Sequence, residues 1–286
     1  MNKNKNLNTP KTIDCNSKLL DLSTPSIMGI LNLTDDSFYD GGKHNSIKKA
    51  LLQTEKMLDD GANIIDIGAY SSRPKATHIS IDEEWQRLEK TLQIINKEFP
   101  HVIISVDTFR SEIALRSVDN GADIINDISA GNLDKEMFDV VAGLNIPYIM
   151  MHMQGTPQTM QDNPHYDCIE KEVVNYFLKK LKTIQQKGLN KIILDPGFGF
   201  GKTVEHNYQL LNKLEELHTL ELPLLVGISR KSMVYKVLGT DAKNSLNGTT
   251  AIHALCLSKG VSILRVHDVK EAVECVKLIN FAKNQL

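Results

Sequence analysis

The sequence predicts an α/β protein with one (β/α)8 barrel domain, the TIM barrel architecture. Short apolar segments alternate along the chain with segments of helical spacing, eight of each kind. The apolar segments are continuous, which is typical of strands that are buried on both faces of a parallel sheet. Similar glycine-led junctions at Gly61, Gly121 and Gly188 lead from a helical segment into a strand. A doubly wound open sheet is the alternative, because periodicity alone does not show that a sheet closes.

The predicted elements follow in order along the chain. The strands are expected at residues 26–33, 63–68, 102–106, 123–126, 147–151, 192–194, 223–228 and 262–266. The helices are expected near residues 46–60, 82–98, up to 120, 135–142, 168–187, 205–217, 231–238 with 246–259, and 269–282. The first helix, for example, has regularly spaced apolar residues and stops at Gly61, a good C-terminal signal. Residues 1–17 are polar and are predicted to be a flexible tail, so the barrel domain spans residues 18–286.

Composition limits the class of protein. The chain has 286 residues, 33 basic against 35 acidic, and no long basic block, which argues against nucleic acid as a partner. Four cysteines form no metal-ligand spacing and indicate reduced thiols of a cytoplasmic protein. The polar start of the chain does not resemble a signal peptide, and no apolar run is long enough to cross a membrane, so no membrane partner is expected.

A glycine-rich stretch follows the sixth predicted strand. Residues 192–203 are Ile-Ile-Leu-Asp-Pro-Gly-Phe-Gly-Phe-Gly-Lys-Thr, so a buried strand ends at Asp195 beside a loop of little side-chain bulk. The spacing from Gly197 to Gly201 is one residue too short for a phosphate-binding P-loop. The glycines also do not match the dinucleotide-binding order. By itself the stretch is better explained as a glycine-rich turn that binds nothing.

Polar or charged side chains follow nearly every predicted strand. The carboxyl ends of the strands in a parallel barrel open onto one face, so these side chains are expected to meet there. In chain order they are Asn32, Asp66, Ser72, Arg73, Asp107, Asn126, Asp127, His152, Asp195, Arg230, Lys231, Ser232, Arg265, His267 and Asp268.

Four of these residues have simpler explanations. Asp127 and Asp268 each precede a local turn or helix, which a carboxylate can cap. Arg230 is equally well explained as a surface charge. His152 follows a Met-rich strand and is more simply a packing histidine.

Seven of the remaining side chains fall into two chemical sets. Carboxylates, an amide and an amine suit the edges of a flat heterocycle, because they accept and donate N–H bonds in parallel. Arginine and histidine suit an anion such as a diphosphate, whose oxygens a guanidinium binds in pairs. The first set is Asp107, Asn126, Asp195 and Lys231, and the second is Arg73, Arg265 and His267. Together they predict a site for a bicyclic ring with a phosphorylated arm.

Eight short motifs, each at a predicted strand end, give the chain a family resemblance over about residues 27–268. They are Met-Gly-Ile-Leu-Asn-Leu-Thr-Asp-Asp-Ser-Phe-Tyr-Asp-Gly-Gly (28–42), Asp-Ile-Gly-Ala-Tyr-Ser-Ser-Arg-Pro (66–74), Ile-Ser-Val-Asp-Thr (104–108), Ile-Asn-Asp-Ile (125–128), Met-His-Met-Gln-Gly-Thr-Pro (151–157), Asp-Pro-Gly-Phe-Gly-Phe-Gly-Lys (195–202), Ser-Arg-Lys-Ser (229–232) and Arg-Val-His-Asp-Val (265–269). In these motifs the chain resembles the dihydropteroate synthases.

The resemblance implies an Mg²⁺-dependent transferase of folate biosynthesis. Such an enzyme joins hydroxymethyl-dihydropterin pyrophosphate to para-aminobenzoate and releases pyrophosphate; family members usually form homodimers. By the same resemblance the pterin is bound by Asp107, Asn126, Asp195, Lys231 and Arg265, and the aminobenzoate by Ser72, Pro74, Phe200 and Ser232. The pyrophosphate is bound by Asn32, Arg73, Arg265 and His267, with Mg²⁺ at Asn32; catalysis is assigned to Arg265, His267, Arg73 and Lys231.

The chain also departs from the usual family pattern. Asp35 replaces a common proline, residues 69–72 are Ala-Tyr-Ser-Ser instead of Gly-Glu-Ser-Thr, and Ser129 replaces a tryptophan. No insertion lies near Phe200, so sensitivity to sulfonamides is the default expectation. Loops 34–44 and 69–79 are expected to be mobile without ligand and to close over the site. The alternatives are a pterin-binding barrel that transfers a methyl group to a cobalamin carrier, and a non-catalytic folate-binding or structural barrel.

Overall fold

The computed structural model describes residues 9–33, 43–72 and 77–285. Asp35, Arg73 and Pro74 lie outside the described residues. The expected mobility of loops 34–44 and 69–79 also falls largely on residues outside this part of the chain.

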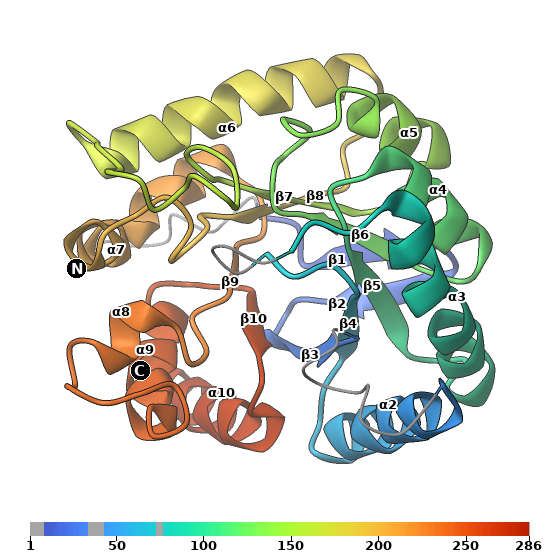
Figure 1. Cartoon of the computed structure of the whole chain (residues 1–286). Helices are drawn as coiled ribbons and strands as arrows, with labels where there is room; N and C mark the ends of the chain where they lie inside the picture. The colour runs from blue at the N-terminus through green and yellow to red at the C-terminus, as the bar shows by residue number, and fades with distance from the viewer. Residues whose placement is uncertain (1–8, 34–42, 73–76, 286) are drawn as a thin grey trace.

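Eight parallel strands form the centre of the fold (Figure 1). Their order in the sheet is β8-β7-β6-β5-β4-β3-β10-β9, and a parallel bridge between Leu194 and Leu224 joins the two ends. The sheet is therefore a barrel, which confirms the predicted fold class and excludes the open sheet. The strands are β3 (Ser26–Asn32), β4 (Ile64–Gly68), β5 (Ile103–Asp107), β6 (Ile124–Asp127), β7 (Tyr148–Met151), β8 (Ile192–Asp195), β9 (Leu225–Val226) and β10 (Ile263–Val266).

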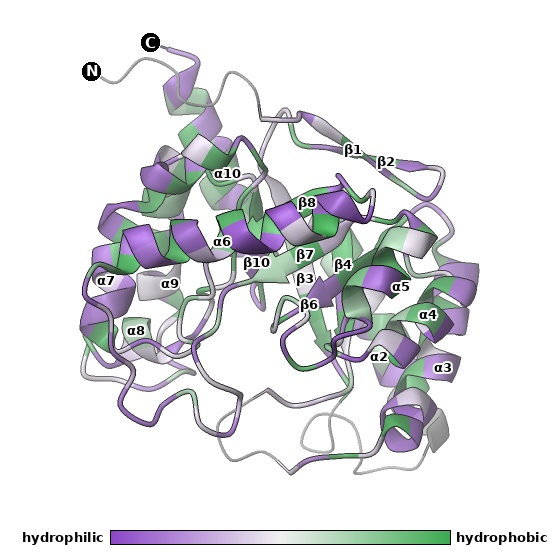
Figure 2. Cartoon of the chain, turned by 90° about the horizontal axis from the view of Figure 1, so that it is seen from above, coloured by the Kyte–Doolittle hydropathy of each residue, from purple (hydrophilic) through white to green (hydrophobic). Residues whose placement is uncertain are grey.

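Helices surround the barrel and present mixed hydrophilic and hydrophobic faces (Figure 2). Buried side chains such as Leu88, Leu92 and Ile95 of α3 recur every three or four positions and pack against the strands. The helices are α2 (Lys43–Asp59), α3 (Ile81–Glu98), α4 (Ser111–Asp119), α5 (Met137–Leu144), α6 (Ile169–Gln186), α7 (Val204–Asn212), α8 (Ser232–Tyr235), α9 (Leu246–Ser258) and α10 (Val269–Lys283).

Two predicted helices differ from the structure. The helix predicted at residues 205–217 ends as α7 at Asn212, and the 3₁₀ helix η1 (Leu214–Leu220) follows. The N–H of Lys213 is shared among three preceding carbonyls at this change of helix type. The helix predicted at residues 231–238 contains only the short α8, because Gly239 takes a positive φ and Thr240 N–H donates back to the carbonyl of Tyr235.

A β-hairpin begins inside the segment predicted as a flexible tail (residues 1–17), so residues 12–15 form a strand instead. Strands β1 (Thr12–Cys15) and β2 (Lys18–Asp21) pair antiparallel, joined by Asn16 and Ser17, which both have positive φ. Ile13, Cys15 and Leu20 are buried in one apolar cluster with strand residues of the barrel. The hairpin forms because its alternating apolar residues bury one face against the barrel. This alternation was missed in the sequence because it is short and lies within a polar segment.

All four cysteines are free thiols, three of them buried. In the part of the chain that the structure describes, no helix combines the length and apolarity needed to cross a membrane.

Candidate active site

Three predicted site residues lie at the carboxyl ends of neighbouring strands. Asn32 of β3 is opposite Gly68 of β4, Gly68 is opposite Asp107 of β5, and Asp107 is opposite Asn126 of β6. Asp107 and Asn32 both lie beside Gly68, since a Cβ built there would be 3.4 Å from Asp107 Cβ and 3.7 Å from Asn32 Oδ1. The register of the sheet therefore places the amide of Asn32 beside the carboxylate of Asp107.

Arg265 of β10 connects this row. Its Nε donates to Asp66 Oδ2 and its Nη2 to Asp107 Oδ2, both at 2.6 Å. Asn126 Nδ2 donates to the same Asp66 oxygen at 3.2 Å, and Ser105 Oγ donates to Asp66 Oδ1 at 2.6 Å. Asp66 is fully buried and forms the hub of a polar network below the opening of the barrel.

The sequence analysis placed Asp66 at a strand end but gave it no role. Its inward position is readable from the strand, since it lies two residues before Gly68 and two after Ile64 of the apolar cluster. Its partner Arg265, 199 positions away, is not readable from the sequence.

Lys231 lies across the glycine-rich loop from this network. Its Nζ donates to the carbonyl of Phe198 at 2.6 Å and is 4.5 Å from the centre of the Phe200 ring. Lys231 and Arg265 both lie beside Gly227, since a Cβ built there would contact Lys231 Nζ at 3.8 Å and Arg265 Cδ at 3.9 Å. The cation of Lys231 thus faces both an aromatic ring and the Arg265 network.

Burial changes the charges of these groups. Burial raises the pKa of Asp107 to about 7, although the Arg265 guanidinium opposes this. Burial lowers the pKa of Lys231 to about 8, opposed by the carboxylate of Asp195. Burial raises the pKa of Asp195 against the charge of Lys231, and Asp195 Oδ1 accepts from Gly197 N–H at 2.7 Å. The site therefore holds acids and an amine whose protonation a ligand can change near neutral pH.

His267 lies next to a fixed ion pair at the mouth of the site. Its Nδ1 and its N–H both approach Ser229 Oγ at 3.2 Å. Desolvation and the charges of Arg265, Arg230 and Lys231 lower its pKa to about 4. This shift favours an uncharged imidazole at neutral pH in the ligand-free site, and the contact of His267 with the pyrophosphate stays a prediction.

Simpler explanations hold for two of the four remaining strand-end residues. Asp127 accepts from the N–H groups of Ser129 and Gly131 at 2.7 and 2.8 Å, so it stabilises a local turn as expected. His152 is buried and packs among aromatic rings, as expected.

Arg230 and Asp268 differ from expectation because they pair with each other. Arg230 Nε and Nη2 donate to the two oxygens of Asp268, both at 2.8 Å. Arg230 is therefore not a free surface charge, and the carboxylate of Asp268 does not cap α10. The pair connects the segment before α8 to the start of α10, beside Lys231 and His267.

The residues predicted for aminobenzoate are placed only in part. Phe200 is half-buried beside Lys231, and Ser232 is half-buried at the first position of α8. Ser72 is half-buried and ends the described segment after β4. Pro74, and Arg73 of the predicted pyrophosphate set, lie outside the described residues.

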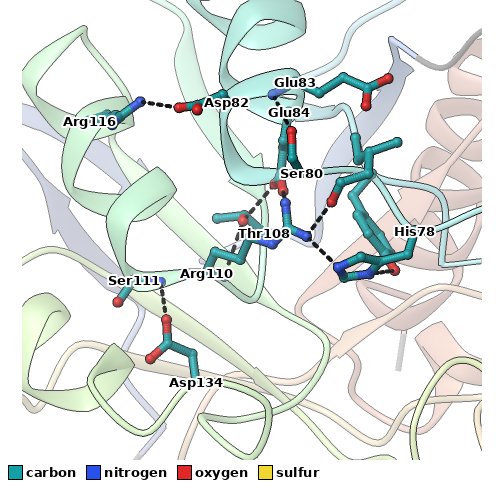
Figure 3. Close-up of polar contacts among 12 residues, drawn as sticks. His78, Ser80, Asp82, Glu83, Glu84, Thr108, Arg110, Ser111, Arg116 and Asp134 are labelled. Atoms are coloured by element: carbon teal, nitrogen blue, oxygen red, sulfur yellow. Dashed lines mark hydrogen bonds and ion pairs between the residues drawn. The ribbon is translucent and has the colours of Figure 1, made fainter.

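A buried ion pair fixes the chain where it returns from the loop after β4 (Figure 3). Arg110 Nη1 donates to Glu84 Oε2 at 2.7 Å, and its Nη2 donates to the carbonyl of Ile79 at 2.6 Å. Thr108 Oγ1 donates to the other oxygen of Glu84 at 2.8 Å, and His78 Nε2 lies 3.3 Å from Arg110 Nη2. No sequence motif revealed this network, since its members come from separate elements.

The donors suit a metal that takes most of its ligands from a substrate. Among the described residues, no group of three or more His, Cys, Asp or Glu side chains is arranged to hold a metal ion. Asn32 offers one amide oxygen at the open end of β3. Mg²⁺ commonly binds one or two protein oxygens together with phosphate oxygens and water, so the set fits Mg²⁺ carried by a diphosphate.

Residues 28–267 match the family described as pterin binding enzyme. The dihydropteroate synthase of Escherichia coli (strain K12) is 45% identical over 262 residues, which cover 91% of this chain and 92% of that protein. The chain belongs to the dihydropteroate synthase family of pterin-binding enzymes. This membership agrees with the strand-end motifs and does not support the methyl-transfer or non-catalytic alternatives.

Solved structures of dihydropteroate synthases have the same fold. A Yersinia pestis dihydropteroate synthase with a sulfonamide drug complex aligns with a TM-score of 0.90 at 41% identity, covering 96% of this chain and 99% of that chain. A Xanthomonas albilineans dihydropteroate synthase with 4-aminobenzoic acid aligns with a TM-score of 0.90 at 35% identity, covering 96% and 99%.

Proposed function

We propose that the strand-end site joins hydroxymethyl-dihydropterin pyrophosphate to para-aminobenzoate, forming dihydropteroate and releasing pyrophosphate. The observation that carries this proposal is the position of Arg265, held by Asp66 and Asp107 and adjacent to Lys231. This arrangement places a fixed cation between groups that suit a pterin and the open mouth of the barrel. It supports charge stabilisation at the carbon that is transferred.

The pterin is assigned to the inner groups. Asp107, Asn126 and Asp195 offer acceptors and a donor for the ring's N–H and carbonyl edges, and Lys231 offers a donor. Because the pKa of Asp107 is raised to about 7, an N–H donor from the ring would stabilise its carboxylate form. Binding a pterin is therefore expected to lower the pKa of Asp107.

The pyrophosphate is assigned to the mouth, where Asn32, Arg265 and His267 are available; Arg73 is assigned to it by the family resemblance. Mg²⁺ at Asn32 would neutralise charge on the diphosphate. In the reaction, the bond from the pterin methylene to the pyrophosphate oxygen breaks, and that oxygen leaves with the bonding electrons. Arg265 and His267 stabilise the leaving charge, the amine nitrogen of para-aminobenzoate bonds to the methylene, and that nitrogen then loses a proton. The protein contributes position and charge, with no covalent nucleophile.

The aminobenzoate is assigned to Ser72, Pro74, Phe200 and Ser232. The half-buried ring of Phe200 supports this assignment, since it offers an aromatic surface beside Lys231. Sulfonamides resemble para-aminobenzoate, so sulfamethoxazole is expected to compete with it. Failure of sulfamethoxazole to compete in a steady-state assay contradicts the assignment.

Release of pyrophosphate, measured with both substrates and Mg²⁺, tests the function. The proposal requires release that depends on each substrate and on Mg²⁺.

Arg265→Ala is expected to reduce turnover at least about 100-fold, because a fixed charge at the transition state is removed. It should also destabilise the fold by about 3 kcal/mol, since two buried carboxylates lose their cation. Arg265→Lys keeps the charge and so separates the loss of turnover from the loss of stability. Full activity of a folded Arg265→Ala protein contradicts the proposal.

We also propose that the protein forms a homodimer in the cytoplasm. Leu278 and Phe281 of α10 are each 71% exposed and Leu255 of α9 is 48% exposed, which leaves apolar side chains for a second copy. Four free thiols support a reducing compartment. Light scattering tests the dimer: Phe281→Glu should give a monomer, and a wild-type monomer at micromolar concentration contradicts it.

A further inference from the structure

The loop from Gly197 to Gly201 is held by side chains from other parts of the chain. The carbonyls of Gly197 and Phe200 accept from Lys202 Nζ at 2.9 and 3.0 Å, and that of Phe198 accepts from Lys231 at 2.6 Å. All five carbonyls of the loop are bonded to a side chain, because Gln161 Nε2 donates to Gly199 and Tyr166 Oη to Gly201, both at 2.8 Å. Such a complete set of ties fixes a loop that forms no helix or strand of its own.

Three of the five loop residues are glycines, so the loop's side-chain packing comes from Phe198, which is buried in the core, and from the half-buried Phe200. Gly197, Gly199 and Gly201 all have positive φ. A Cβ at Gly197 would lie 1.9 Å from the carbonyl oxygen of His152, so the loop rests directly on the turn after β7. Main-chain atoms of Gly197 therefore meet main-chain atoms of His152, and the side-chain donors add to the packing of Phe198.

Among the side chains that donate to the loop carbonyls, Lys202 has the most hydrogen-bond partners. It is 3% exposed, and its Nζ also lies 3.0 Å from His152 Nδ1 and 3.4 Å from the His152 carbonyl oxygen. Burial lowers the pKa of His152 to about 2, so its uncharged ring accepts this bond. Four acceptors surround an amine with at most three donors, which leaves Lys202 none for a substrate.

The opposite side of the loop faces the candidate active site. Phe198 gives its carbonyl to Lys231, and Phe200 places its ring 4.5 Å from Lys231 Nζ. Lys202 is bonded to the carbonyl of Phe200 itself and to that of Gly197, which directly precedes Phe198. A shift of the loop would therefore move the ring of Phe200 and the acceptor of Lys231 together.

We propose that Lys202 is a positioning residue for the transfer reaction, which acts by holding the Gly197–Gly201 loop against His152 and so sets the place of the Phe200 ring and of Lys231. Gln161 and Tyr166 assist it at Gly199 and Gly201. This role rests on the proposed contact of Phe200 with para-aminobenzoate. It differs from catalysis, since Lys202 touches the loop and not the substrate.

Lys202→Met tests the proposal, because methionine keeps an unbranched chain and removes all donors. We expect the KM for para-aminobenzoate to rise about tenfold or more, because small displacements of a positioned group have large effects. The Kd of sulfamethoxazole should rise in parallel. Lys18→Met is the matched control: Lys18 Nζ donates to the Val102 carbonyl and Asp123 at 2.7 and 2.8 Å, beside the starts of β5 and β6 at the other end of the barrel. This control should lower Tm and leave both constants unchanged.

A double-mutant cycle separates positioning from general damage. If Lys202 acts through Phe200, Phe200→Ala should raise the KM strongly in the wild-type background and at most about twofold in the Lys202→Met background. Additive effects in the two backgrounds, or an unchanged KM in folded Lys202→Met, overturn the proposal for Lys202. If Phe200→Ala alone has no effect, the aminobenzoate assignment fails instead.

Milder variants keep the test decisive if Lys202→Met does not fold. Gln161 is exposed, so Gln161→Leu removes its tie to Gly199 with little risk to the core, and Tyr166→Phe removes only a hydroxyl. Each should raise the KM for para-aminobenzoate about two- to fivefold and couple to Phe200→Ala in the same direction. An unchanged KM in both variants contradicts the proposal.

Discussion

The two ends of the barrel are built from the same strands and differ in chemistry. At the amino end, inward residues such as Ile64, Ile103 and Ile124 form an apolar cluster that the β1–β2 hairpin covers. Two residues further along the same strands, the inward positions are Asp66, Ser105 and Asn126. One end is therefore a sealed core and the other a polar cup. On each of these strands, therefore, an inward residue that stabilises the fold lies only two positions before an inward residue of the polar site.

The largest expected effect comes from removing the charge at the hub of the cup. Asp66→Asn keeps the size of the side chain and leaves Arg265 with one carboxylate partner. We expect kcat/KM to fall about 100-fold, because the guanidinium loses the bond that orients it. Ile64→Val, one inward position below on β4, is the control and should cost about 1 kcal/mol of stability with normal kinetics. If Asp66→Asn keeps more than half of the wild-type activity, Asp66 does not orient Arg265 for the reaction.

The sealed end should respond in the opposite way. Leu20→Ala in β2 removes a side chain that is 2% exposed, and we expect a loss of about 2–4 kcal/mol in urea unfolding with unchanged KM values. The neighbouring Leu19 is 66% exposed, so Leu19→Ala should change stability by less than about 0.5 kcal/mol. Equal losses in the two variants mean that the hairpin does not seal the barrel.

The pH dependence of stability sharpens the contrast, because the cup contains a carboxyl whose pKa is raised to about 7. The pKa of Asp107 is about 7 in the folded protein against an ordinary value of 3.8. A group whose folded pKa is raised gives stability that is present below pH 4 and is lost as the pH rises through 7. The unfolding free energy of Asp107→Asn should therefore improve relative to wild type by about 1–2 kcal/mol between pH 5 and pH 8.

Urea titrations of wild type and Asp107→Asn at the two pH values measure this difference. Asp14→Asn serves as the control, since Asp14 lies in the exposed pair with Lys191 and its pKa is lowered by that partner. A constant or reversed difference for Asp107→Asn rules out a raised pKa.

The smallest expected effect concerns the entry to the cup. Tyr70 Oη lies 3.1 Å from His78 Nδ1 and accepts from Gln158 Nε2 at 3.3 Å, so it joins both ends of the loop after β4. Tyr70→Phe should cost about 1 kcal/mol or less and raise the KM of a substrate about threefold at most. Steady-state kinetics measures this change. An effect larger than that of Asp66→Asn would place the critical contacts in the loop instead of the cup.

The predictable part of the structure is the part set by local pattern. The strand that ends at Asp195 was predictable because an apolar run from Ile192 is followed by Asp-Pro-Gly. The strand β5 was predictable in the same way, because an apolar run ends at Asp107. The hairpin was missed because only Ile13, Cys15 and Leu20 signal it within a polar segment. Periodicity finds elements that bury a long face and misses short ones that depend on a distant surface.

The sequence by itself determined the succession of strands along the chain and the identity of the side chains at their carboxyl ends. Both follow from burial, which repeats along the chain at a fixed period. Only the tertiary structure decided that Asp66 meets Arg265 and that Lys202 holds the carbonyls of Gly197 and Phe200 against His152. These contacts depend on the register of the sheet and on closure of the barrel, which join residues whose separation along the chain carries no periodic signal.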